Sequence, residues 1–173
     1  MIRRQHAPIL ATLLCLAFSS SSQAQLTDSE LFRVTVKPRM SIAAPTGTVS
    51  QFHDETDNNQ NFPLQRWLVV SNHVAGATAV FETTQAFTHT VDSTYKRDAS
   101  LSLSLVSGST WNVTTPTATT AYASSDEVVS VAAESTGPGS AAFDLAVSLV
   151  EEAFADLAAG DYEMTVVGTL TAN

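Results

Sequence analysis

The sequence contains a single cysteine, Cys15, among 173 residues. No disulfide can form within the chain, and cysteine-ligated zinc or iron–sulfur centres are excluded because they need several thiolates. An exported domain without disulfides depends on its hydrophobic core for stability, and roughly 150 residues bury enough surface for this. We therefore predict one domain, spanning residues 25–173.

Basic residues are also scarce, since eight Lys and Arg stand against 17 Asp and Glu. Two of the eight, Arg3 and Arg4, belong to a segment that we expect to be removed. The remaining chain is strongly acidic, and an acidic surface repels phosphate backbones and anionic head groups. We therefore expect no nucleic acid among its partners and no attraction to anionic membranes.

Long apolar runs are missing except at the start, where Ala7–Phe18 is apolar. This run is too short to cross a bilayer, which takes about 20 residues. Two arginines precede it, and small residues ending in Ser22-Gln23-Ala24 follow it, which is the pattern of a secretory signal peptide. We predict a signal peptide at residues 1–24, a mature start at Gln25, secretion to the periplasm, cell surface or medium, and no membrane insertion after cleavage.

Motifs of enzymes and metal sites are absent from the sequence. There is no Gly-x-Ser-x-Gly elbow, no His-Glu-x-x-His motif and no phosphate-binding glycine loop. We assign no catalytic, cofactor-binding or metal-binding residue, and we expect a protein that is not an enzyme and has no cofactor. The histidines of the predicted mature chain, His53, His73 and His89, are expected on the surface or in turns, although His73 and His89 would converge if their segments paired.

The most polar stretch is His53–Asn61, which has no apolar residue and cannot be core. Its Asp and Asn side chains offer the oxygen ligands that calcium prefers. It is not an EF-hand loop, because Asn59 and Gln65 stand where that loop, counted from Asp54, needs Gly and Glu. We favour a solvated loop over a calcium site.

Aromatic residues make up 8% of the chain, and four of them raise the alternative of a sugar-stacking surface. These are Trp67, Trp111, Tyr95 and Tyr122. Trp67 lies inside an apolar run and is expected in the core. Trp111 has polar neighbours and is the better candidate for the surface, although burial is favoured for it as well.

Alternating apolar residues predict strands, since successive side chains of a strand point to opposite faces. The clearest alternation is in residues 141–172, where two such runs flank residues 151–159, a candidate helical turn. The other predicted strands are Leu31–Lys37, an edge strand at 40–42, 66–71 (covered on both faces), its hairpin partner 77–82, 87–91, 101–105, 111–113 and 128–133. Residues 114–126 are predicted to be a long connection.

Eight to ten short strands separated by turn residues are typical of a β-sandwich. We predict an all-β fold, an immunoglobulin-like β-sandwich of two antiparallel sheets, with a jelly roll as the alternative. Within it, we expect Leu31–Lys37 to pair as the first strand.

The C-terminal strand, with Ala159-Gly160-Asp161-Tyr162 followed by Met164–Thr171, resembles the end of bacterial surface β-sandwich proteins such as fimbrial subunits and spore-coat-type secreted domains. The disulfide of such subunits is missing, and Ala172 stands where pilins carry an aromatic residue. The resemblance implies assembly by strand exchange, in which one subunit donates an alternating strand to another. Leu31–Lys37 would be that donor.

Our leading hypothesis is an exported, non-enzymatic structural or adhesive protein of the cell envelope or extracellular matrix. Its partner would be a second copy, another surface protein or a glycan. A secreted carbohydrate-binding module is the alternative, and a secreted hydrolase ranks third.

Overall fold

The structure is a computed structural model that describes residues 26–173. The predicted signal peptide and Gln25 lie outside the described residues. The chain divides at Thr35 into a short N-terminal part and a larger unit, residues 36–173, that contains every strand of the described chain. No helix in the described chain is long and apolar enough to cross a membrane.

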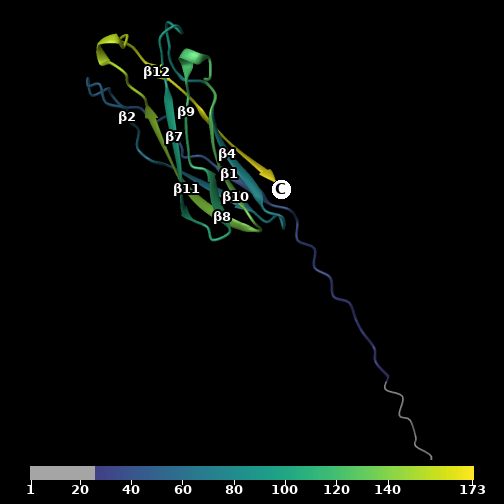
Figure 1. The fold of residues 1–173 in the computed structure, drawn as a ribbon. Helices are drawn as coiled ribbons and strands as arrows, with labels where there is room; N and C mark the ends of the chain where they lie inside the picture. Colours follow the sequence, from purple (N-terminus) through teal and green to yellow (C-terminus); the bar gives the residue numbers. More distant parts are fainter. Residues whose placement is uncertain (1–25) are drawn as a thin grey trace, which may run out of the picture. The chain divides into compact units, whose positions relative to one another are not determined.

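The larger unit is an all-β sandwich of antiparallel sheets, as predicted. Its first sheet has the order β1-β3-β11-β7-β9, with β2 pairing to one end of β11, and Figure 1 shows β7 and β11 side by side in it. The strands of this sheet are β1 (Met40–Ala43), β2 (Gln60–Asn61), β3 (Gln65–Ser71), β7 (Ala99–Ser107), β9 (Thr117–Thr119) and β11 (Gly139–Leu149).

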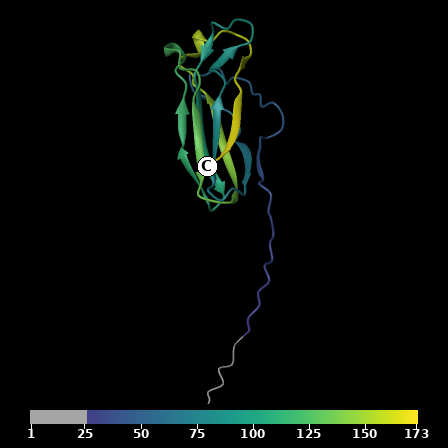
Figure 2. The same cartoon turned by 90° about the vertical axis from the view of Figure 1, so that its right-hand side faces the viewer.

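The second sheet has the order β13-β4-β10-β8, so that β13, yellow in Figure 2, is an edge strand. A third, small sheet has the order β12-β5-β6. The strands of these two sheets are β4 (Ala77–Thr83), β8 (Trp111–Thr115), β10 (Ser130–Ser135), β13 (Val166–Ala172), β5 (Phe87–His89), β6 (Lys96–Arg97) and β12 (Tyr162–Glu163). Two 3-10 turns, η1 (Tyr122–Ser124) and η2 (Phe154–Asp156), complete the fold.

Aromatic side chains join the two large sheets. Phe143 of β11 is fully buried and makes edge-to-face contacts with Phe81 of β4 at 6.0 Å and with Trp111 of β8 at 5.8 Å between ring centroids. Trp67 of β3 contacts Phe81 in the same way at 5.1 Å. Such contacts add about 0.5–1.5 kcal/mol each to the stabilisation from burial. The core therefore depends on four rings, two from each sheet.

The outer face of the first sheet carries an ion pair between the paired strands β3 and β11. Arg66 of β3 lies opposite Asp144 of β11 and forms two hydrogen bonds to its carboxylate, both 2.9 Å long. The hydrogen bond from Arg66 is the main reason why the pKa of Asp144 is lowered. Both side chains are partly or largely exposed, so this pair fixes the register more than it adds stability.

Gly168 lets the two sheets approach each other at the β13 edge. A Cβ atom there would lie 2.6 Å from Cζ3 of Trp67 and 2.9 Å from Cδ1 of Ile42. These distances are shorter than van der Waals contact, so no larger residue fits without displacing Trp67. Glycine at this position brings β13 against the side chains of β1 and β3.

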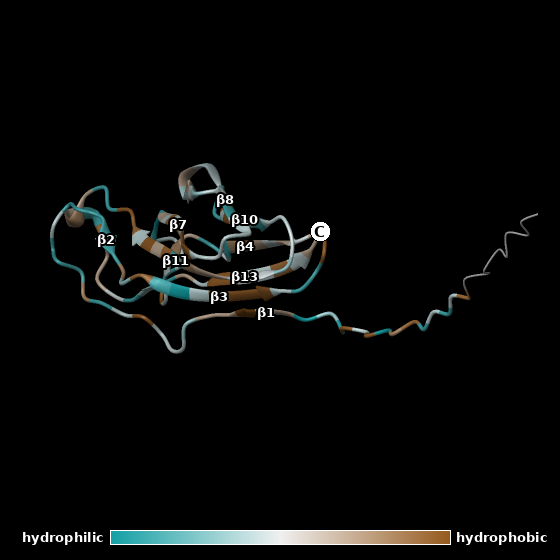
Figure 3. Ribbon diagram, turned by 90° about the horizontal axis from the view of Figure 1, so that it is seen from below, coloured by the Kyte–Doolittle hydropathy of each residue, from teal (hydrophilic) through white to brown (hydrophobic). Residues whose placement is uncertain are grey.

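Several strand predictions are confirmed, including the edge strand β1 and the alternating strand β11, and η2 is the helical turn in residues 151–159. The hairpin of 66–71 with 77–82 was wrong, because β3 and β4 lie in different sheets. Only one face of β3 is buried, since Leu68 is 54% exposed. Figure 3 shows that this strand begins with hydrophilic residues and ends with hydrophobic ones. The connection 114–126 contains a strand, β9.

The prediction of a paired first strand at Leu31–Lys37 was also wrong. These residues have no strand partner, and their apolar side chains are exposed. The exposed fractions are 83% for Phe32, 89% for Val34 and 77% for Val36. Apolar and polar residues do alternate in this segment of the sequence, but β1, not this segment, pairs with β3.

We predict that F143A lowers the free energy of unfolding by about 3–5 kcal/mol, because it opens a cavity between the sheets. The matched control is F52A, since Phe52 is fully exposed and its truncation should change stability by less than about 0.5 kcal/mol. Urea unfolding followed by tryptophan fluorescence measures both. Equal losses in the two variants would contradict the assigned core.

Candidate functional site

The polar loop His53–Asn61 is exposed at residues 54–59, as expected of a solvated loop, and it is ordered by hydrogen bonds among its own side chains. Asp54 Oδ1 accepts hydrogen bonds from the hydroxyl of Thr56 at 2.7 Å and from Nε2 of Gln60 at 2.7 Å, and Gln60 itself is buried. The Thr56 hydroxyl is the first cause of the lowered pKa of Asp54. Within residues 26–173, no group of three His, Asp or Glu side chains is placed to hold a metal ion.

The loop is held by Glu151, whose side chain is completely buried. Glu151 Oε1 accepts hydrogen bonds from Nε of Arg97 at 3.2 Å and from the backbone N–H groups of Glu152 at 3.0 Å and Ala153 at 3.2 Å. Its Oε2 lies 3.2 Å from Nε2 of His53. A buried carboxylate needs such donors to offset the loss of hydration. Because these four donors engage both of its carboxylate oxygens, Glu151 acts as a structural anchor.

Hydrogen bonding fixes the tautomer of His53. The backbone N–H of Glu55 donates to Nδ1 of His53 at 2.9 Å, so Nδ1 is an acceptor and the ring proton sits on Nε2. That proton is donated to Glu151. The ring also stacks on Phe154 with a centroid distance of 5.1 Å. His53 thus connects the polar loop to η2, a contact that no motif in the sequence predicts.

The other two histidines have separate structural roles and do not form a site together. His73 lies in the turn after β3, where Nδ1 is 3.2 Å from the carbonyl oxygen of Gly76. His89 is buried, accepts hydrogen bonds at Nδ1 from the N–H groups of Val91 and Asp92, and contacts the carbonyl oxygen of Ala159 through Nε2. The prediction of surface or turn positions holds for His73 and is wrong for His89.

His89 also explains the glycine at the turn before β12. Gly160 has φ +147°, and a Cβ atom there would lie 2.1 Å from Nε2 of His89. Tyr95 and Tyr162 pack edge-to-face on the same imidazole, at 6.1 and 5.2 Å. The Gly160-Asp161 turn is therefore set by its packing on a buried histidine.

The tryptophans do not form a sugar-stacking surface, because Trp67 is 8% and Trp111 only 1% exposed. Trp111, the better surface candidate from the sequence, faces the core because it begins β8 opposite Ser135 of β10 and points toward Phe143. Of the two tyrosines, Tyr95 is 44% exposed and packs on His89, and Tyr122 is half-buried in η1.

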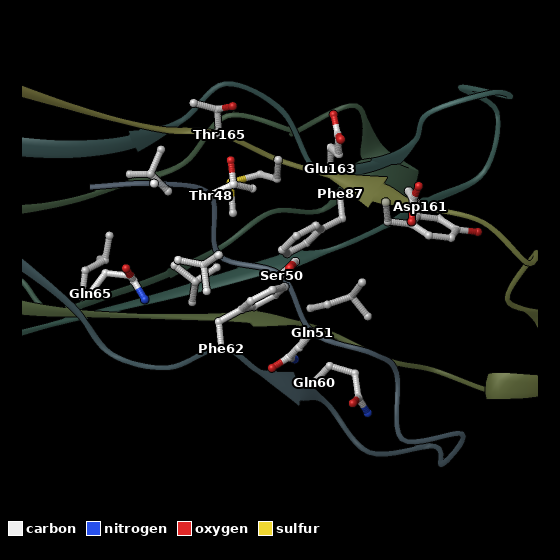
Figure 4. A pocket seen from close by; sticks show the side chains of 18 of the residues that line it. Thr48, Ser50, Gln51, Gln60, Phe62, Gln65, Phe87, Asp161, Glu163 and Thr165 are labelled. Atoms are coloured by element: carbon white, nitrogen blue, oxygen red, sulfur yellow. The ribbon is translucent and has the colours of Figure 1, made fainter. Parts of the chain in front are cut away.

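A groove of about 840 Å³ lies between the sheets on the side of β1, β3 and β13. Its floor is apolar and includes buried Trp67, Phe87 and Leu145. Figure 4 shows the rings of Phe62 and Phe87 near its middle, stacked with a centroid distance of 5.7 Å. Further apolar residues from β11, β12 and β13 line it: Val147, Leu149, Tyr162, Met164 and Val166.

The rim of the groove is polar and acidic. Asp161 and Glu163 are exposed and lie together at one side of the groove in Figure 4. Beside them, burial raises the pKa of Tyr162. Gln65 and Thr165 complete the polar rim on the other side. An apolar floor with a carboxylate rim suits an apolar ligand or peptide that carries positive charge.

The segment Ala44–Phe52, which we call the strap, lines the mouth of the groove. It leaves β1 and ends before His53, and it has no strand or helix. None of the hydrogen bonds of the described chain involves a strap residue, and all of its side chains except Pro45 are exposed. A segment without hydrogen bonds and with exposed side chains opens at small free-energy cost.

Comparison with family models, with curated proteins and with solved structures finds no match to this chain. The groove and the Glu151 anchor are therefore recognised from the geometry of the structure alone. Sequence reasoning missed both, because their residues come from separate strands and form no motif. The only signal of the anchor was a pair of glutamates after a strongly apolar strand.

We predict that E151Q lowers the free energy of unfolding by about 3 kcal/mol, because it leaves the buried Arg97 guanidinium without a charged partner. The matched control is E152Q at the neighbouring, exposed position, where the change should be under about 0.5 kcal/mol. Chemical unfolding measures the difference. Similar stability of E151Q and E152Q would contradict the structural role of Glu151.

Proposed function

We propose that this protein is an exported, non-enzymatic structural or adhesive component of a cell envelope or extracellular matrix, and that it associates with further copies of itself. The observation that supports this is the exposed alternating segment at Leu31–Lys37. Phe32, Val34 and Val36 alternate with polar residues in the sequence and are at least 77% exposed. Exposed apolar alternation of this kind is a template for pairing with another chain.

The polar groups of the sandwich support the non-enzymatic part of the proposal. The most deeply buried carboxylate, Glu151, has its oxygens engaged by Arg97, His53 and two backbone N–H groups. The ring nitrogens of His89 are occupied by backbone groups. Groups that are saturated in this way hold the fold and are not placed to transfer protons to a substrate.

The carbohydrate-binding alternative is less well supported. It requires aromatic rings that lie flat and exposed, and both tryptophans are instead buried between the sheets. We therefore retain self-association as the proposed activity of this exported chain.

We predict that residues 25–173 form oligomers in solution, and that V34D/V36D converts them to monomers because a charged side chain cannot enter an apolar interface. The measurement is molar mass by light scattering. The matched control is V91D/V128D, which adds the same two charges at valines that are 89% and 50% exposed in the sandwich.

The control should assemble like the unmodified chain, and thermal unfolding should be unchanged in V34D/V36D, because these valines make no strand pairs. A monomeric unmodified chain, or equal loss of assembly in both double variants, would refute the proposed function.

A further inference from the structure

We propose that His89 is a pH-sensitive switch: its protonation in mild acid opens the small sheet β12-β5-β6 and uncovers the apolar cluster beneath that sheet, while the two large sheets stay closed. This inference does not depend on the proposed self-association. It concerns a buried histidine to which the proposed function gives no part.

Hydrogen bonds hold His89 in one neutral form. Its Nδ1 accepts hydrogen bonds from the backbone N–H groups of Val91 at 3.2 Å and Asp92 at 3.0 Å, so Nδ1 carries no proton. The ring proton is on Nε2, which lies 3.2 Å from the carbonyl oxygen of Ala159. A second proton would have to bind Nδ1, where it would face two N–H donors. Protonation therefore breaks both of these hydrogen bonds.

The imidazole has no room to turn away from these donors. His89 is only 8% exposed, and the rings of Tyr95 and Tyr162 pack edge-to-face on it. The turn at Gly160 closes another side, because even a Cβ atom there would lie 2.1 Å from Nε2 of His89. A proton on Nδ1 is accommodated only when the loop after β5 and the turn before β12 separate.

The charges near the ring do not offset this cost. Asp92 attracts a proton to His89, but the pKa of Asp92 is lowered mainly by the Thr94 hydroxyl, and the attraction to His89 contributes least. Asp92 is also exposed, so water screens its charge. The other charged residues on the strands and turns packed against the ring are Lys96, Arg97, Asp161 and Glu163. Both cations are paired with carboxylates, and both of these acids are exposed.

The small sheet can open without the rest of the fold. Its strands are two or three residues long, and none of them pairs with a strand of either large sheet. The rings around Phe143 that join the large sheets belong to a different apolar cluster. Local opening therefore costs less free energy than global unfolding. It would expose the smaller cluster, two of whose rings are visible in Figure 4: Phe62, Phe87, Ala99, Val147, Leu149, Tyr162 and Met164.

The direction of the pH effect follows from proton linkage. An imidazole free in water takes up a proton below about pH 6.5, whereas the closed sheet keeps His89 neutral. The open form therefore binds more protons, and the equilibrium constant for closing falls by up to about tenfold for each pH unit below this value. The carboxylates with lowered pKa, Asp54, Asp92 and Asp144, lose their contribution only below about pH 5. The range from pH 7 to 5 thus isolates the histidines.

Hydrogen exchange of residues 25–173 tests the switch, followed by mass spectrometry at about pH 7 and pH 5 and corrected for the ordinary pH dependence of amide exchange. Peptides covering 87–95 and 158–164 report on the small sheet. Peptides covering 66–71 and 141–149 report on the large sheets. We expect protection of the first pair to fall at least about tenfold at the lower pH, with no change in the second pair. A dye that binds exposed apolar surface should gain fluorescence in parallel.

Residues 37–43 provide a second reference, because no histidine side chain holds them. Asn72 binds them with three hydrogen bonds: its side chain binds the carbonyl of Lys37 at 2.9 Å and the N–H of Arg39 at 2.6 Å, and its own N–H binds the carbonyl of Arg39 at 3.0 Å. Their protection should be the same at both pH values.

The variant H89N should remove the pH dependence. Its side-chain oxygen can accept the hydrogen bonds that Nδ1 accepts, and it does not titrate. The matched controls are H73N and H53N, which should keep the response of the unmodified chain. Nδ1 of His73 faces the carbonyl oxygen of Gly76, so its other nitrogen is left to take a proton. His53 lies against the carboxylate of Glu151, which attracts a proton.

Four results would overturn the switch: unchanged protection of the small sheet at pH 5, an equal loss in the large sheets, a loss that persists in H89N, or a loss that H53N or H73N removes. If H89N does not fold, nitrogen NMR of the unmodified chain decides. We expect His89 to gain its proton together with loss of protection at the amides of Val91 and Asp92. A protonated His89 beside protected amides would refute the proposal.

Discussion

The packing of Phe143 against Phe81 and Trp111 is the interaction on which the rest of the sandwich depends. These rings join a strand at the centre of one sheet to two strands of the other. Because these rings are large and fully buried, they set the distance between the two sheets where β11 faces β4 and β8. Gly168 then allows the β13 edge to approach Trp67. A second, smaller apolar cluster, which includes the stacked rings of Phe62 and Phe87, lies at the groove.

Near the groove, polar contacts add to the packing of this smaller apolar cluster. Glu151 collects donors from β6, from the loop before β2 and from the turn that follows β11. This cluster holds three connections that have little apolar surface of their own. Aromatic packing thus holds the two large sheets together, and the buried carboxylate of Glu151 holds the loops near the groove.

The sequence was sufficient to predict the fold class, because the alternation in residues 141–149 and 101–105 predicts strands with one apolar face, and turn residues separate many such short runs. It was not sufficient to predict strand partners. Residues 66–71 and 77–82 are separated by a short turn, as a hairpin would be, yet the chain crosses there from one sheet to the other. Alternation states which side chains share a face, and it carries no information on which strand lies beside them.

The same limit explains the errors at Leu31–Lys37 and at the candidate site. The alternation of this segment is as regular as that of β11, but no sheet edge remains for it in the place where a first strand was expected. The polar residue that follows Trp111 points outward from β8, so it gives no information on whether the indole is buried. Glu151 and His53 are 98 positions apart in the sequence, so their contact depends on the finished fold.

The anchoring of residues 37–39 by Asn72 has a mechanical consequence. In a chain of linked copies, tension on the N-terminal segment would first load the three hydrogen bonds to Asn72, which continues directly from β3. β3 lies between β1 and β11, so the force would pass into an interior strand that is held on both sides. The four-residue strand β1 would not separate from β3 until the hydrogen bonds to Asn72 broke.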